Sequence, residues 1–144
     1  MNVSMVATVA VISAEPSESR RLFIDALGLP LEGQGDGYYS SDRIPGCNHF
    51  GIWPLAEAAE ACFGTPEWPE GLAVPQASIE FEVEHPAAVE AAASELQSAG
   101  FELLHPPRTE PWGQIVARLL TRDGMIVGMS YAPAFHQSPG SKAV

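Results

Sequence analysis

The sequence predicts an α+β fold made of two tandem βαβββ modules that together form a cleft or a partial barrel. The first observation behind this prediction is a spacing. Thr8 and Ser78 each open a strand-like run and lie 70 residues apart, and Pro16 and Pro86 have the same separation. The second observation is that each of these prolines begins a helical segment that ends at a glycine, which is the usual asymmetry of helix termini. A supersecondary unit that recurs at a fixed offset predicts a repeated architecture.

The first module is expected over about residues 4–54. The β-branched run Thr8–Ile12 predicts its first strand, and Pro16–Leu27 predicts its helix, closed by Gly28. Three short strands should follow this helix. They are expected near Leu29–Gly33, Gly37–Ser41 and Asn48–Trp53. In the helix, one buried apolar stripe is expected, formed by Leu22, Phe23, Ala26 and Leu27.

The second module is expected over about residues 76–133, after a connector over 55–75 that carries a short helix at Leu55–Phe63. The alternating run Ser78–Val83 predicts its first strand, and Pro86–Ala99 predicts its helix, closed by Gly100. Its last three strands are expected at Phe101–Leu104, Gln114–Thr121 and Met125–Tyr131, with an Asp123-Gly124 turn before the last. Residues 134–144 should form a flexible tail. The whole chain is expected to be a single domain.

Charge and hydropathy exclude several classes of partner. Eighteen acidic and seven basic residues give a net charge of −11, and no Lys or Arg occurs between Ile44 and Pro107. Because nucleic acids and anionic membranes bind clustered basic residues, neither is expected as a partner. The negative field favours a neutral or cationic ligand, or it serves only to keep the protein soluble. The weakly polar run Val3–Ile12 is too short to span a bilayer, so a cytoplasmic protein is expected.

The two cysteines, Cys47 and Cys62, are too few for a disulfide scaffold and too far apart for a zinc knuckle. Cys62 lies in an apolar helical segment, where a buried thiol packs as a small hydrophobic side chain. We expect both cysteines to be reduced and structural.

Three features together resemble the vicinal oxygen chelate superfamily, which includes glyoxalase I, extradiol dioxygenases and bleomycin-resistance proteins. They are the duplicated strand, proline, helix and glycine pattern, the PWGQ loop at Pro111–Gln114, and the closing segment RDGMIVGMSYAP at Arg122–Pro133. The resemblance covers about residues 5–132. It implies paired βαβββ modules and a homodimer in which two chains complete each cleft.

Metal-using members of this superfamily place His, Glu or Gln on the first and last strands of each module. The resemblance carries these positions over to Thr8, a residue of Asn48–Trp53, Ser78 and Gly128, where only His49 is a good ligand. Divalent ions in proteins need at least three protein donors of this kind. The sequence is therefore expected to hold no metal and no cofactor, and no catalytic residue is assigned.

Two glutamates leave an alternative open. Glu80 and Glu82 share one face of the strand Ser78–Val83. Such a pair can perform acid–base chemistry if burial raises one pKa. The same alternation is typical of a solvated sheet face, which is the interpretation that we favour.

Aromatic side chains outside the helices indicate a ligand site. Trp112 lies between a proline and a glycine, and bleomycin-resistance-like proteins have a tryptophan in the equivalent loop. Trp112 and Trp53 are expected to stack on a planar ligand, whereas a tryptophan that only caps the core or a dimer seam is the structural alternative, favoured for Trp68. Polar orientation of the ligand is expected from His49, Glu110 and Gln114. The full candidate set is His49, Phe50, Trp53, Trp68, Glu110, Trp112 and Gln114.

These observations predict a metal-free protein that sequesters a hydrophobic or aromatic natural product, or an amine-bearing one, in the manner of antibiotic self-resistance proteins. The alternative is a metal-dependent lyase or isomerase of the glyoxalase type, or a dioxygenase. A small-molecule sensor would need the same pocket and has no separate sequence signature.

Overall fold

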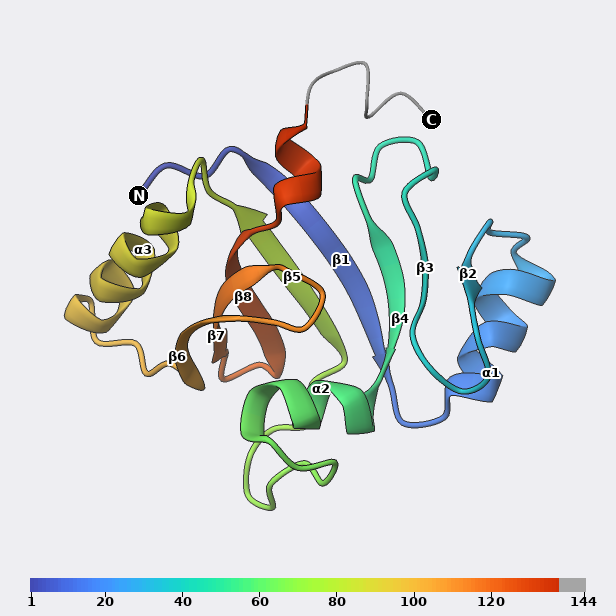
Figure 1. The fold of residues 1–144 in the computed structure, drawn as a ribbon. Helices are drawn as coiled ribbons and strands as arrows, with labels where there is room; N and C mark the ends of the chain where they lie inside the picture. Colours follow the sequence, from blue (N-terminus) through green and yellow to red (C-terminus); the bar gives the residue numbers. More distant parts are fainter. Residues whose placement is uncertain (138–144) are drawn as a thin grey trace.

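The computed structural model describes residues 1–137 and has an α+β fold built on one eight-stranded mixed open sheet (Figure 1). The strands are β1 (Met5–Ser13), β2 (Glu32–Gly33), β3 (Tyr39–Ser41), β4 (Phe50–Pro54), β5 (Ala77–Glu82), β6 (His105–Thr109), β7 (Ile115–Leu120) and β8 (Met125–Tyr131). The α-helices are α1 (Pro16–Arg20), α2 (Leu55–Phe63) and α3 (Pro86–Ser98). The α+β class predicted from the sequence is confirmed.

The strand order is β2-β3-β4-β1-β5-β8-β7-β6, so each half of the chain contributes four neighbouring strands. The first strands of the two halves, β1 and β5, pair antiparallel at the centre of the sheet. On either side, β1 pairs parallel with β4, and β5 pairs parallel with β8. The two halves of the chain thus place their last strands next to the central pair.

The two faces of the sheet carry different helices. On one face α3 packs over Phe81, Ala117 and Met129 and forms an apolar cluster with them. On the opposite face α2 buries Cys62 against Ala10 and other apolar side chains of the central strands. In Figure 1, α3 and α1 lie at opposite ends of the sheet and α2 lies below its centre.

The predicted first helix is interrupted. It begins at Pro16, but residues Arg21–Ala26 form a π-helical segment, η1, in which the N–H of Leu27 donates to the carbonyl of Leu22. The prediction of one buried stripe is wrong here, because Leu22 and Leu27 are 51% and 58% exposed. A π-helical turn contains extra backbone, which shifts side chains out of the 3.6-residue register that the prediction assumed. Phe23 still packs against Phe50 of β4.

Two other segments differ from the prediction. The strand expected at Phe101–Leu104 begins instead at His105, and its pairing with β7 is irregular before Arg108. Pro106 and Pro107 lack backbone N–H groups, so this strand is tolerated only at the sheet edge. The flexible tail expected at 134–144 begins within a 3₁₀ helix, η2 (Pro133–His136), and its residues from 138 lie outside the described residues.

Within residues 1–137, none of the helices has the length and apolar character that a membrane crossing requires.

Candidate functional site

The sheet register brings polar side chains into one row across the face that α2 partly covers. Thr8 of β1 pairs with Glu80 of β5, which pairs with Gly128 of β8. Gly128 in turn pairs with Arg118 of β7, and Arg118 pairs with His105 of β6. We call this face, which carries Glu80 and Arg118, the polar face.

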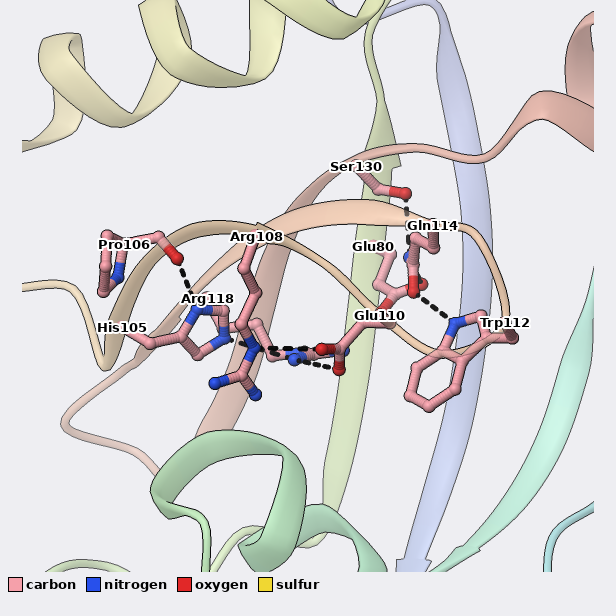
Figure 2. Close-up of polar contacts among 9 residues, drawn as sticks. All are labelled: Glu80, His105, Pro106, Arg108, Glu110, Trp112, Gln114, Arg118 and Ser130. Carbon is pink, nitrogen blue, oxygen red and sulfur yellow. Dashed lines mark hydrogen bonds and ion pairs between the residues drawn. The ribbon is translucent and has the colours of Figure 1, made fainter.

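A buried amide organises the C-terminal half of the polar face (Figure 2). The Nε2 group of Gln114 donates to Oε1 of Glu80 and to Oγ of Ser130, both at 2.8 Å. All three side chains are buried. Gly128 makes room for Glu80, because a Cβ at that position would lie only 3.0 Å from the Glu80 Cγ. The orientation of the Gln114 amide is therefore fixed by two buried acceptors.

The same amide holds an exposed indole. Oε1 of Gln114 accepts a 2.8 Å hydrogen bond from Nε1 of Trp112, whose residue is 61% exposed. The loop that carries Trp112 turns at Gly113, which has a φ of +93° that favours glycine. The backbone of Glu110 closes this turn through bonds with Gly113 and Gln114. A large aromatic surface is thus presented to solvent in a fixed orientation.

A charged cluster lies beside this network. Glu110 is buried and accepts from Nη1 of Arg118 at 3.0 Å and from Nε of Arg108 at 2.9 Å. Nδ1 of His105 donates to the carbonyl of Pro106, so its Nε2 accepts from Nη1 of Arg118 at 3.2 Å. Burial, followed by Arg108 and Arg118, lowers the pKa of His105 below its usual value. The imidazole therefore acts as a neutral acceptor.

The N-terminal half of the polar face carries a chain of three side chains. Nδ1 of His49 donates to the carboxylate of Asp42, and the remaining nitrogen, Nε2, accepts from the hydroxyl of Tyr38 at 2.9 Å when the ring is neutral. Tyr38 lies across Gly51, where an added Cβ would clash with the phenolic oxygen. Burial, and then the carboxylates of Glu80, Asp42 and Glu57, raises the pKa of Tyr38. Tyr38 consequently stays protonated.

The structure places the seven predicted site residues in different surroundings. Glu110, Trp112 and Gln114 lie together in the C-terminal network, and the ring of buried Trp53 lies 5.6 Å from the guanidinium carbon of Arg118. His49 lies on the other half of the face, with both ring nitrogens already bonded to protein.

The remaining two predicted residues lie apart from this network. Phe50 packs against Phe23, with ring centroids 5.9 Å apart. The ring of Trp68 packs edge-to-face against Phe63, and its indole N–H donates to the carbonyl of Ala73.

Sequence reasoning missed several members of the polar face. Glu80 is 9% exposed and Glu82 is fully buried, so the favoured prediction of a solvated carboxylate face is wrong. Burial raises the pKa of Glu82, which accepts from His136 of η2. Arg118 follows Gln114 at a spacing of four, an even number that puts both side chains on one face of a strand. This spacing could have identified Arg118 as a member of the polar face.

The side chains at the family's metal positions offer too few donors for a divalent ion. In the register Glu80 lies between Thr8 and Gly128, and Ser78 pairs with Ala10. Of the side chains at these positions and at His49, only two are good ligands, and Gln114 already occupies one oxygen of Glu80. Among residues 1–137, no group of three or more His, Cys, Asp or Glu side chains lies close enough to hold a metal ion. The residues present do not fit such an ion.

Other features of the surface lie apart from this network. A hollow of about 390 Å³ is lined by residues around Val6 and Cys47, and another of about 450 Å³ lies between Met1 and α3. Both cysteines are free thiols in the structure, as expected, and burial raises the pKa of Cys62 to about 11. This thiol is therefore unreactive near neutral pH.

Residues 6–128 match the family model of the Glyoxalase/Bleomycin resistance protein/Dioxygenase superfamily. Among solved structures, a member of that superfamily from Vibrio splendidus 12B01 is similar, with a TM-score of 0.57, 13% identity, and coverage of 89% of this chain and 98% of that one.

Two further structures share the fold. A variant of the Streptomyces coelicolor methylmalonyl-CoA epimerase, in complex with 2-nitronate-propionyl-CoA, has a TM-score of 0.54, 14% identity, and coverage of 96% and 100%. A protein from Legionella pneumophila described as an NAD-dependent benzaldehyde dehydrogenase has a TM-score of 0.56, 14% identity, and coverage of 86% and 96%. No curated protein matches the sequence. At these identities the likeness concerns the fold alone.

Proposed function

Because the chain belongs to the glyoxalase/bleomycin resistance protein/dioxygenase superfamily, we propose that it is a metal-free binding protein of the antibiotic-resistance type. It sequesters a hydrophobic or aromatic natural product on the polar face of its sheet. Trp112 provides the stacking surface, and Gln114, which Glu80 and Ser130 hold, fixes the orientation of the indole ring.

The observation that carries this proposal is the tether between Trp112 and Gln114. An exposed tryptophan has two rotatable side-chain bonds, and ordering it on a ligand costs entropy. Here the indole N–H already donates to the amide oxygen of Gln114, whose amide nitrogen in turn donates to Glu80 and Ser130. The aromatic platform is pre-organised, which is a property of binding sites for planar ligands.

The donor set supports binding rather than metal-dependent lyase, isomerase or dioxygenase chemistry. His49 has Asp42 and Tyr38 on its two ring nitrogens, and Glu80 holds Gln114. Recruiting these two side chains to an ion would break both arrangements and would still leave the ion one protein donor short.

We also propose that the protein acts in the cytoplasm as a homodimer in which two chains complete each cleft. Leu22 and Leu27 are exposed apolar side chains available for contact with a second copy. Native mass spectrometry separates a 15.3 kDa chain from a particle of twice that mass.

Binding of 9-aminoacridine, a planar aromatic amine, tests the stacking role. Trp112→Ala should weaken its binding about tenfold or more, since a stacked base contributes about 1–3 kcal/mol. The titration follows the probe's own fluorescence, and the affinity is taken from the midpoint of the curve, since removal of the indole also changes the size of the signal. Thermal-shift assays with polycyclic and glycopeptide antibiotics extend the search to larger ligands.

The matched control is Phe101→Ala, which removes an aromatic side chain of similar exposure, 55%, outside the polar face. It should leave the affinity unchanged. Equal affinities of wild type and Trp112→Ala, or the absence of binding by any planar compound, would contradict the proposal.

A further inference from the structure

Arg118 is an unusual group in the core of this protein. Among residues 1–137 it is the largest fully buried side chain, with 1% exposure. Its Nη1 group contacts Glu110 and His105, whereas Nε and Nη2 are buried and have no hydrogen-bond partner among the described residues. A buried donor without an acceptor costs free energy, so these two groups require an explanation.

The two unpartnered nitrogens form a single edge of the guanidinium group. In arginine, Nε–H and one N–H of Nη2 point in parallel from the same side of the plane. This edge matches two neighbouring oxygens, as in a carboxylate, and binds them through two charge-assisted hydrogen bonds. The opposite end, Nη1, is the one that the protein occupies.

The local charges leave room for an anionic group. Glu110 is the carboxylate that contacts Arg118, and it is shared with Arg108. Glu80 lies in the same row across Gly128 but accepts from the amide of Gln114, so Glu110 is the one carboxylate in contact with the two guanidinium groups among the described residues. His105 contributes no negative charge, since it is a neutral acceptor in this cluster. This arrangement contrasts with the chain as a whole, which has a net charge of −11.

The surroundings of Arg118 also suit an oriented ligand group. Trp53 lies 5.6 Å from the guanidinium carbon and forms an apolar wall beside it. Glu110 and His105 hold Nη1, so the plane of the guanidinium group is fixed before any ligand arrives. Charge-assisted hydrogen bonds are stronger in such a shielded place than in water.

The geometry points to Arg118 as a carboxylate-binding subsite, whose Nε and Nη2 groups hold both oxygens of a carboxylate carried by the small molecule. This inference rests on the proposed function and adds a chemical class to it: the ligand of the polar face bears a carboxylate or an equivalent planar pair of oxygens.

Formate is a suitable probe because it is the smallest carboxylate and therefore displaces the least of the surroundings that bury Nε and Nη2. In wild-type protein, the Arg118 Nε–H resonance should shift with formate and reach saturation, and the melting temperature should rise in parallel, relative to chloride at the same ionic strength. The resonance is assigned by its disappearance in Arg118→Lys. This variant keeps the positive charge but lacks the two-nitrogen edge, and it should bind formate about tenfold more weakly or not at all.

Arg43→Lys is the matched control, since Arg43 forms an exposed ion pair with Glu32 and should leave the formate response unchanged. A wild-type response that does not saturate, or an equal rise in melting temperature in Arg118→Lys, overturns the inference. The 9-aminoacridine titration separates the two proposals. If 9-aminoacridine binding depends on Trp112 but formate does not bind at Arg118, only this inference is contradicted. If formate binds at Arg118 but 9-aminoacridine binding does not depend on Trp112, only the stacking proposal is contradicted.

Discussion

The two halves of the polar face use opposite strategies to hold polar groups on the same sheet. In the N-terminal half, the chain Tyr38–His49–Asp42 runs outward and ends at a carboxylate whose side chain is 72% exposed. In the C-terminal half, Glu110 and Arg118 form an ion pair that is almost completely buried. With the same strand order, one half of the sheet thus carries polar groups that reach solvent, and the other half carries an ion pair removed from it.

This difference indicates where binding energy is available. Charges that remain in water interact weakly, because solvent screens them. Charges removed from water interact strongly with whatever partner reaches them. The C-terminal half also carries the exposed indole of Trp112 and the two donors of Arg118 that lack a partner among the described residues. We therefore propose that ligand recognition falls mainly to the C-terminal half.

The largest expected effect comes from removing the shared buried carboxylate. Glu110→Ala leaves Arg118 buried without a counter-ion and should lower the free energy of unfolding by about 3–5 kcal/mol. Urea unfolding followed by tryptophan fluorescence measures this loss.

Asp42→Ala is the corresponding change in the N-terminal half and removes the exposed partner of His49. It should cost about 0–1 kcal/mol. Similar losses in the two variants would break the proposed contrast between the halves.

A smaller effect is expected from the pH dependence of stability. His105 has a lowered pKa in the folded protein, so the unfolded chain takes up a proton first as the pH falls. Its contribution to stability is present above the usual histidine pKa of about 6.5 and is lost as the pH falls toward the lower folded value. The free energy of unfolding of wild type should therefore decrease more between pH 7.5 and 5.5 than that of His105→Gln.

His85→Gln is the control for this pH experiment, since His85 is exposed at the start of α3. Its pH profile should follow that of wild type. A wild-type pH profile that matches that of His105→Gln would contradict the assignment of His105 as a neutral acceptor in the buried cluster.

Local signals in the sequence predicted several elements well. The helix Leu55–Phe63 and the strand Met125–Tyr131 have the predicted bounds, and the helix predicted at Pro86–Ala99 spans Pro86–Ser98. Each of these elements has its own start, stop and periodicity within a short segment. The prediction failed for the first helix because its π-helical turn changes the register without changing the apolar composition.

The site was predictable only where it is local. Glu110, Trp112 and Gln114 fall within one loop, so a motif could identify them together. Glu80 and Arg118 depend on the pairing between distant strands.

The repeat offset of 70 residues equates Thr8 with Ser78, but an offset does not give cross-strand partners. The strands β1 and β5 run antiparallel with Val9 opposite Ile79, so Thr8 pairs with Glu80. Equivalent residues of two antiparallel strands therefore lie diagonally, and the side chain directly opposite follows only from the strand pairing.

Native mass spectrometry of the purified protein tests the metal-free binding proposal most directly, because it weighs the folded particle with everything that it binds. We predict a dimer with the mass of two bare chains, unchanged by chelator. One tightly held zinc, nickel, manganese or iron ion per chain, lost together with ligand binding on chelation, would contradict it.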